Sequence, residues 1–270
     1  MKKSSEMLKL SVSSIKTYEQ CPRKWFFSYK EKHPRREWAH LFLGTFVHEV
    51  LEDFHNSLLQ NPDQEWAGLM THIFKECLAK KNDKPEPDGT FKPKHPLTKE
   101  TKLKAHEMLV VYLKVLKRDG LPNVIANERD FSYEISPNLT IRGFIDRIDL
   151  DNEGNYIVQD YKSGRSKYLD EFQLLVYGLA LLEEAPDLEK FKGSYIMLGE
   201  GSKKLQYVFS RTDIDRVVEK IKKVADKIQS DKTWEPKPAF LCKWCDFEAI
   251  CPAMKLIKHG DAGWTQTSNG

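Results

Sequence analysis

The sequence predicts a single α/β domain with a helical insertion and a cysteine-bearing end. Apolar residues at helical spacing dominate residues 11–120, period-two runs with turn formers lie within residues 121–232, and three cysteines follow at residues 240–252. A chain of 270 residues with 40% hydrophobic and 11% aromatic residues can bury a substantial core. We therefore expect one domain over residues 1–258 and a disordered tail over residues 259–270.

The first half of the chain is predicted to be helical. Serines that can cap a helix precede apolar residues at helical spacing over residues 11–30, where Pro22 is expected to end one helix and open the next. Three further helices are expected at residues 41–59, 64–81 and 99–119. The proline-rich segment 84–97 predicts a loop or lid between the last two helices.

The second half is predicted to hold the strands. Three strand-like runs lie at residues 124–136, 139–150 and 156–162. The turn formers at residues 151–155 join the last two runs and predict a hairpin. The remaining expected elements are a helix at 169–184, strands at 193–198 and 205–210, and a long amphipathic helix that Thr212 caps and that ends near Lys232.

The predicted hairpin carries two acids and a lysine. Asp146 lies on its first strand, and Asp160 and Lys162 lie two residues apart on its second, so the last two side chains share one face. The neighbours of Asp146 on its own face are apolar and are expected to point into a core: Phe144, Ile148 and Leu150. A carboxylate on a buried face is costly unless it is paired or holds a metal.

This set of side chains is the minimal equipment for metal-assisted hydrolysis of a phosphodiester. Acids can hold a divalent cation through oxygen ligands, and an ammonium can stabilise developing charge or position the attacking water. The alternative is a buried Asp–Lys ion pair beside a solvated hairpin. The hairpin alone does not separate the two interpretations.

The five cysteines give a second signal. Cys77 lies on an apolar helix face and is predicted to be a core thiol. The other four could form one site, with C-x2-C-x5-C near the end of the chain: Cys21, Cys242, Cys245 and Cys251. Four thiolates suit zinc or an iron–sulfur cluster, and the short spacing, the cysteine–proline pairs and the flanking aromatic residues favour the cluster. The alternative is an ordinary helix cysteine at position 21 and a partial zinc knuckle near the end.

Charge and hydropathy exclude some classes of protein. The net charge is only +3, so overall charge does not indicate nucleic-acid binding, and the local clusters of lysine and arginine support it only weakly. No run resembles a membrane span. The first twenty residues lack the apolar stretch of about 7–15 residues that a secretory signal needs. We expect a cytoplasmic protein in a reducing compartment.

Several motifs occur in a fixed order along the chain. They are SSIKTYEQCPRKW, GTFVHEVLEDF with His48, then Glu128, Asp146, the triplet Asp160-Tyr161-Lys162, and Gln173-x-x-x-Tyr177. In this order the chain resembles the RecB-type nucleases of the PD-(D/E)xK superfamily, from Ser13 to Pro252. The cysteine arrangement is similar to the subgroup that holds a 4Fe–4S cluster, which includes the RecB-like exonuclease of CRISPR adaptation and the AddB nuclease domains.

The resemblance implies a restriction-endonuclease-like core, in which helices flank a central mixed sheet. It implies that Mg²⁺ or Mn²⁺ is ligated by His48, Asp146, Asp160 and the Tyr161 carbonyl. Lys162 would be the catalytic lysine, Gln173 and Tyr177 would position DNA, and Glu128 would support the site from the preceding strand. It also implies a 4Fe–4S cluster, in preference to zinc, on Cys21, Cys242, Cys245 and Cys251.

The expected function is a metal-dependent DNase, an exonuclease that acts on single-stranded DNA ends. It would serve recombination, repair, phage replication or CRISPR adaptation, with a helicase, recombination or CRISPR-adaptation protein as its partner. A non-catalytic DNA-binding or adaptor subunit is disfavoured because every expected catalytic position is filled. A zinc-stabilised RNA-binding module gives no use to Asp146, Asp160 and Lys162.

Overall fold

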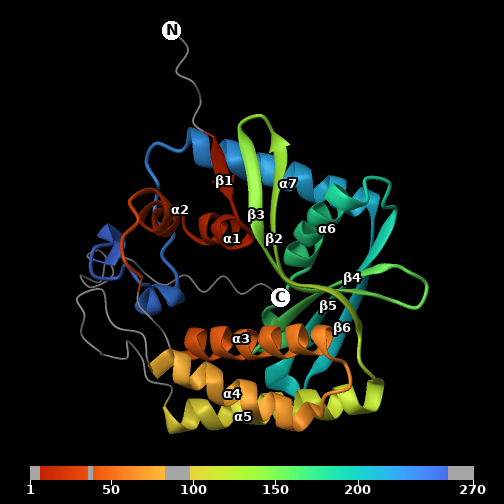
Figure 1. Ribbon diagram of the computed structural model, residues 1–270. Coiled ribbons are helices and arrows are strands. Elements are labelled where there is room, and N and C mark those ends of the chain that lie inside the picture. Colours follow the sequence, from red (N-terminus) through yellow and green to blue (C-terminus); the bar gives the residue numbers. More distant parts are fainter. Residues whose placement is uncertain (1–6, 36–38, 83–97, 255–270) are drawn as a thin grey trace. The chain divides into compact units, whose positions relative to one another are not determined.

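A computed structural model describes residues 7–35, 39–82 and 98–254 of the protein (Figure 1). The chain divides into two compact units. The small unit comprises Met1–Arg36, Glu134–Arg142 and Val218–Gly270, and the large unit comprises Glu37–Tyr133 and Gly143–Val217. The loop expected at residues 84–97 and the tail expected at residues 259–270 lie outside the described residues.

The large unit contains a mixed sheet in which β3, β4, β5 and β6 are neighbours in that order, as the sequence predicts for an α/β fold. The strands are β3 Leu139–Leu150, β4 Tyr156–Lys162, β5 Lys190–Met197 and β6 Lys203–Ser210. β4 pairs antiparallel with β3 and parallel with β5, while β6 pairs antiparallel with β5. β2 (Asn123–Ser136) also pairs with β3, and both strands continue into the small unit.

The hairpin between β3 and β4 forms as the sequence predicts. Asp151 begins the turn, and its Oδ1 accepts hydrogen bonds from the backbone N–H groups of Glu153 and Asn155 at 2.9 and 2.8 Å. Gly154 has φ +81°, which a glycine adopts without the steric cost of a side chain. The turn fixes a register in which Arg147 lies opposite Gln159.

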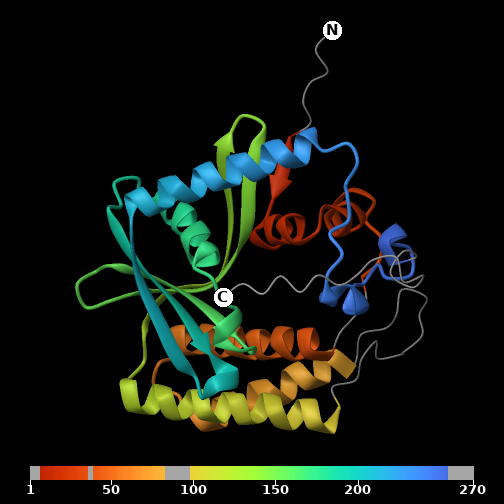
Figure 2. The same ribbon diagram turned by 180° about the vertical axis from the view of Figure 1, so that it is seen from behind.

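Helices cover both faces of this sheet (Figure 1 and Figure 2). One layer consists of α3 Ala39–Gln60, α4 Trp66–Asn82 and α5 Lys99–Asp119. This layer packs against Tyr161 and Ile196, and it buries Cys77 as expected for a core thiol. α6 (Phe172–Glu184) lies on the other face, so close that a Cβ on its Gly178 would be 2.6 Å from the Phe191 ring.

The small unit contains a short strand that the sequence did not predict. β1 (Leu8–Leu10) pairs parallel with the first three residues of β3. The helix break expected at Pro22 is confirmed, because α1 Val12–Gln20 ends before it and α2 Pro22–Trp25 begins on it. Trp25 stacks on Trp234 with ring centroids 5.1 Å apart, so the start of the chain packs on the segment after α7 (Arg211–Ser230).

Two expectations of the sequence analysis are wrong in detail. Phe144 does not point into a core, because 59% of the residue is exposed. Thr212 does not cap α7. Ser210 and Asp213 do so together, since the Ser210 N–H and hydroxyl donate to Asp213 at 2.9 and 2.6 Å, and the helix ends at Ser230. No helix in the described part of the chain is long and apolar enough to cross a membrane.

Candidate active site

Three potential metal ligands meet in the large unit. His48 comes from α3, Glu128 from β2 and Asp146 from β3, and one ligand atom of each lies within 4.8 Å of the others. They adjoin a cavity of about 560 Å³, whose walls include His48, Glu128, Tyr161 and Lys162. The resemblance had assigned Glu128 only a supporting role, whereas the structure includes it in the group of three.

The backbone of Tyr161 connects two members of this group. Its N–H donates a 2.7 Å hydrogen bond to Asp146 Oδ2, and its carbonyl oxygen accepts a 2.9 Å hydrogen bond from His48 Nε2. The other ring nitrogen, Nδ1, lies 3.4 Å from Asp146 Oδ2, and in the cationic imidazole it carries a proton that faces the carboxylate. A cation bound here would replace that proton, because a metal-ligating histidine offers a lone pair.

A closed ring of polar contacts lies beside this group. Asp160 is 1% exposed, and its Oδ2 lies 2.6 Å from Lys162 Nζ. The ammonium donates to Gln173 Oε1 at 3.0 Å, the Gln173 amide donates to the Tyr177 hydroxyl at 2.8 Å, and that hydroxyl donates back to Asp160 Oδ1 at 3.0 Å. Each side chain of this ring contacts two others, so the Lys162 ammonium is held in a fixed position next to the acids.

The site concentrates negative charge out of water. Burial, followed by the charges of Asp146 and Glu52, raises the pKa of Glu128 to about 7. Burial and the charge of Asp146 also raise the pKa of Asp160, against the opposing effects of Lys162 and His48. Burial disfavours a charged His48, but the hydrogen bond and charge of Asp146 outweigh it and raise the pKa of His48 to about 9. Mutual repulsion among the acids is what a bound cation relieves.

The donor set fits a small divalent cation. Carboxylate oxygens and one imidazole nitrogen suit Mg²⁺ or Mn²⁺, and sulfur is absent from the group. Glu128 has φ +43°, a left-handed conformation that is strained for a residue with a side chain and that occurs at functional sites. Of the ligands implied by the resemblance, His48, Asp146 and the Tyr161 backbone are in contact, while Asp160 bonds to Lys162 and Tyr177 at the side of the group.

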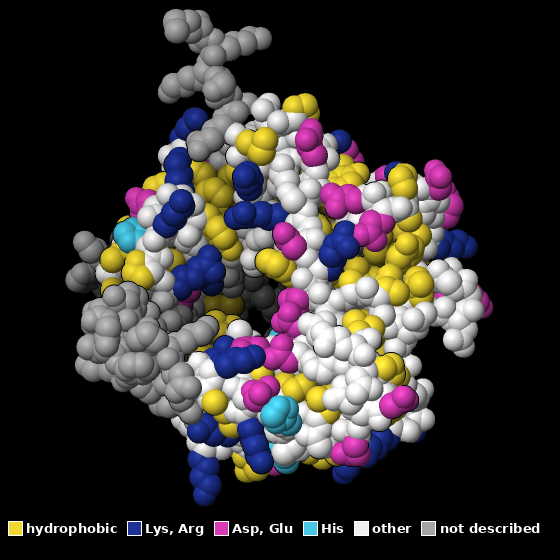
Figure 3. Space-filling model, viewed as in Figure 1, with side chains coloured by type: hydrophobic (Ala, Val, Ile, Leu, Met, Phe, Trp, Pro, Cys, Tyr) yellow, Lys and Arg dark blue, Asp and Glu magenta, His cyan; other side chains and the backbone are white. Residues whose placement is uncertain are grey.

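Two further acids of α3 line the same cavity and were not expected from the sequence, Glu49 and Glu52. Glu52 follows His48 by four residues, so the two share a helix face, and this spacing could have identified it. Glu49 forms an ion pair with Lys81. Figure 3 shows acidic side chains gathered along the edge of α3.

The four cysteines expected to form a cluster site all lie in the small unit and line one cavity of about 30 Å³. Cys21 Sγ accepts a hydrogen bond from the backbone N–H of Lys237 at 3.5 Å, and Cys242 Sγ accepts one from Ala239 at 3.3 Å. Burial raises the pKa of Cys245 and Cys251. Among the described residues, no three sulfur atoms lie within 4.8 Å of one another.

The sequence is similar to parts of several known proteins. An ATP-dependent helicase/deoxyribonuclease subunit of Clostridium perfringens is 28% identical over 211 residues, which is 67% of this chain and only 18% of that protein. The Gene 69 protein of Mycobacterium phage L5 is 35% identical over 136 residues, covering 48% of this chain and 45% of that protein.

The fold also matches a solved structure. A protein of Eubacterium rectale that carries the provisional name of an exonuclease aligns with a TM-score of 0.51 at 14% identity, over 92% of this chain and 89% of that one. A family model for the PD-(D/E)XK nuclease superfamily matches residues 9–252. Because this match extends over most of the sequence, the chain belongs to the PD-(D/E)XK nuclease superfamily.

Proposed function

We propose that the protein is a metal-dependent deoxyribonuclease that degrades single-stranded DNA from its ends. The observation that carries this proposal is the group His48–Glu128–Asp146 next to the ion pair of Asp160 and Lys162. Metal-assisted hydrolysis of a phosphodiester requires side chains that bind a cation and a positively charged group held in place beside them. A buried ion pair without catalytic use gives no reason for His48 and Glu128 to converge on it.

His48, Glu128 and Asp146 would hold Mg²⁺ or Mn²⁺. The resemblance implies Asp160 and the Tyr161 carbonyl as further ligands. When bound, the cation would polarise the scissile phosphate and lower the pKa of a water molecule. Lys162 Nζ contacts Asp160 and Gln173, which leaves the third N–H of its ammonium for another partner. Because Lys162 lines the cavity, this N–H would donate to a phosphate oxygen or to the attacking water. Gln173 and Tyr177 act through this contact, since they hold Lys162 and Asp160 in position.

DNA as the substrate is supported by the relatives. The Clostridium perfringens protein is named a helicase/deoxyribonuclease subunit, although this chain spans 18% of its length. A preference for DNA ends agrees with the provisional name of the Eubacterium rectale protein. We therefore infer a nuclease that works beside a helicase or another recombination, phage-replication or CRISPR-adaptation protein.

We also propose that Cys21, Cys242, Cys245 and Cys251 hold a 4Fe–4S cluster. The four side chains line one cavity, and two of the sulfurs accept backbone N–H groups, as the sulfurs of such sites do. The short C-x2-C-x5-C spacing, the cysteine–proline pairs and the flanking aromatic residues support the cluster in preference to a single zinc ion.

Cleavage of labelled DNA tests the nuclease proposal. Linear single-stranded, linear double-stranded and circular single-stranded DNA are incubated with the protein in Mg²⁺, in Mn²⁺ and in EDTA. We expect degradation of the linear single strand in either metal, none in EDTA, and an intact circle because it has no end. Cleavage of the circle would replace the exonuclease with an endonuclease, and no cleavage of any DNA would overturn the proposal.

Anaerobic purification tests the cluster proposal separately. The protein is expected to be brown and to contain about four iron and four sulfide per chain. Cys21→Ser should lose this iron, whereas Cys77→Ser should keep it because Cys77 is buried in the other unit. A colourless protein with stoichiometric zinc, or equal iron loss in both variants, would contradict the cluster.

A further inference from the structure

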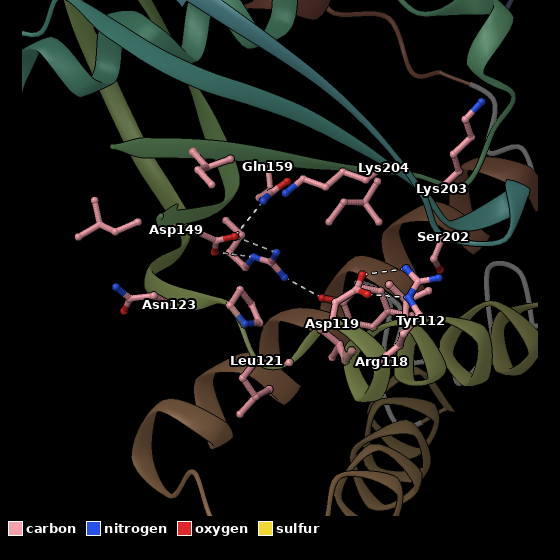
Figure 4. Close-up of a pocket in the computed structure, with 18 of the residues that line it drawn as sticks. Tyr112, Arg118, Asp119, Leu121, Asn123, Asp149, Gln159, Ser202, Lys203 and Lys204 are labelled. Carbon is pink, nitrogen blue, oxygen red and sulfur yellow. Dashed lines mark hydrogen bonds and ion pairs between the residues drawn. The ribbon is translucent and has the colours of Figure 1, made fainter. Parts of the chain in front are cut away.

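A second cavity lies on the other face of the strands that carry the catalytic acids. Arg147 follows Asp146, and Gln159 precedes Asp160, so their side chains leave the opposite face of the sheet. A cavity of about 670 Å³ extends over this face to the end of α5 (Figure 4). Its volume lies in the range of small-molecule sites, about 300–1,000 Å³.

Two buried polar atoms of this cavity have no partner in the described structure. Gln159 is 1% exposed, and its Nε2 donates to Asp149 Oδ2 at 2.8 Å, while its Oε1 accepts no hydrogen bond. Ser202 is 3% exposed, its hydroxyl is also without a partner, and its backbone has φ +56°. A buried polar atom without a partner destabilises the folded protein, so both atoms would gain from a ligand that supplies hydrogen bonds.

The charges around Gln159 leave one cation in excess. Arg147 is compensated by Asp149, with Nε 2.8 Å from Oδ1, and Arg118 is compensated by Asp119 in the same way at 2.6 Å. Lys204 forms no salt bridge among the described residues, and Figure 4 shows its side chain extending towards Gln159. The Lys203 side chain points away from Gln159 in Figure 4, because neighbouring side chains of a strand leave opposite faces. Beside Gln159 the cavity therefore offers the Lys204 ammonium, without a salt bridge among the described residues, next to one unpaired acceptor.

Apolar side chains form part of the remaining wall, which also includes Asn123 and Asn152. α5 contributes Leu116, β4 contributes Ile157 and β5 contributes Ile196, all of them buried. These side chains suit a flat, weakly polar ring. A complementary ligand therefore combines an anion for Lys204, a hydrogen-bond donor for Gln159 and a ring for the apolar wall.

We propose that this cavity binds a nucleoside monophosphate. The phosphate contacts Lys204, a sugar hydroxyl donates to Gln159 Oε1, and the base lies against Leu116 and Ile196. The three features occur together in this class of molecule, with the hydroxyl close to the phosphate. The choice of this class also rests on the proposed function, since an exonuclease releases mononucleotides.

Calorimetric titration in EDTA tests the site, because without a divalent cation the candidate active site has no metal to hold a phosphate. The probes are dAMP, dideoxy-AMP, deoxyadenosine and inorganic phosphate. We expect dAMP to bind and each of the other three, which lacks the hydroxyl, the phosphate or the nucleoside, to bind about tenfold more weakly or worse.

Variants locate the binding. Lys204→Ala should weaken dAMP binding about tenfold or more, because a hydrogen bond to a charged group is lost. Lys190→Ala, which removes an exposed lysine of β5 outside the cavity, and Asp160→Asn on the other face should leave it unchanged. Thermal melting checks that each variant is folded.

Three results would overturn the site: no saturable binding of dAMP in EDTA, equal binding by the Lys204→Ala and Lys190→Ala variants, or loss of binding in Asp160→Asn. Inorganic phosphate that binds as tightly as dAMP would reject the nucleotide as the ligand. The proposed nuclease is judged by a different measurement. Binding of dAMP by a protein that cleaves no DNA would refute the nuclease and keep the cavity assignment.

Discussion

Arg147 donates a 2.6 Å hydrogen bond to the hydroxyl oxygen of Tyr161, while the backbone of Tyr161 contacts Asp146 and His48 at the candidate active site. The same Nη1 atom lies 2.7 Å from the Tyr112 hydroxyl and 3.0 Å from His55 Nε2. This buried network fixes the side chain of Tyr161 on one face of the sheet. It thereby helps to fix the backbone that orients His48 and Asp146 at the site.

Replacing Arg147 with methionine should destabilise the protein strongly. The substitution leaves Asp149 as a buried charge without its partner, which costs about 3–5 kcal/mol of unfolding free energy. Urea unfolding measures the loss. Lys192→Met is the control, since it breaks the more exposed pair with Asp151 and should lower the unfolding free energy much less. Equal losses in the two variants would show that the Arg147 network contributes no more than a surface pair.

Replacing Tyr177 with phenylalanine should slow DNA cleavage. It removes the hydroxyl that donates to Asp160 and accepts from Gln173, and loss of such a supporting contact costs about 10–100-fold in activity or metal affinity. Steady-state cleavage rates and Mn²⁺ titrations measure the two effects. Tyr195→Phe removes a hydroxyl that donates to the Asp170 carbonyl instead, and it should retain the wild-type rate. A Tyr177→Phe variant as active as Tyr195→Phe would argue against a positioning role.

Replacing Glu128 with glutamine should raise the melting temperature in the absence of metal and reduce the stabilisation that metal provides. In EDTA at pH 8 the melting temperature should rise, because burial and the charges of Asp146 and Glu52 disfavour the Glu128 carboxylate. In Mn²⁺ the wild-type protein should gain more stability than the variant, because it has one more ligand for the ion. Glu183→Gln, at an exposed position, is the control and should change neither melting temperature. A metal-induced shift of the same size in all three proteins would exclude Glu128 as a ligand.

Stability should fall in mild acid because of His55. Burial and the charge of Arg147 hold the pKa of His55 well below 6.5, so below about pH 6.5 the unfolded chain takes up a proton that the folded protein does not. The unfolding free energy is thus unaffected by His55 above pH 6.5. It decreases by up to about 1.4 kcal/mol per pH unit as the pH falls from there towards the lowered folded value.

Urea titrations between pH 5 and 8 measure this dependence. Below about pH 6.5 the unfolding free energy of a His55→Gln variant should depend less steeply on pH than that of the wild-type protein. The difference in slope should correspond to about one proton taken up on unfolding. Identical slopes in the two proteins would mean that His55 titrates alike in the folded and unfolded states.

Local patterns predicted much of the fold. The helix expected at residues 99–119 and the strands expected at 139–150 and 156–162 have those bounds in the structure. The strand Leu8–Leu10 was missed, because three residues show no periodicity and the strand depends on pairing with a segment more than 120 residues away. Phe144 was assigned to a core from strand alternation alone, which does not show whether another element covers that face.

The candidate site was predicted less completely. The strand spacing placed Asp160 and Lys162 on one face, and their 2.6 Å contact agrees. The sequence did not indicate Glu128 as a member of the ligand group. Its backbone has an unusual φ of +43°, which no local sequence pattern predicts. The pairing of Arg147 with Tyr161 was invisible in the sequence, since it depends on the register between two strands and on helices packed over them.

The rate of DNA cleavage by a Lys162→Met variant tests the central claim most directly. The substitution removes the ammonium that contacts Asp160 and Gln173, and keeps most of the side-chain volume. With linear single-stranded DNA and Mn²⁺, we expect the rate to fall at least about a hundredfold. Lys190→Met, which leaves the site untouched, should cleave at the wild-type rate. A folded Lys162→Met variant that cleaves as fast as the wild-type protein would contradict the assignment of this site as a nuclease centre.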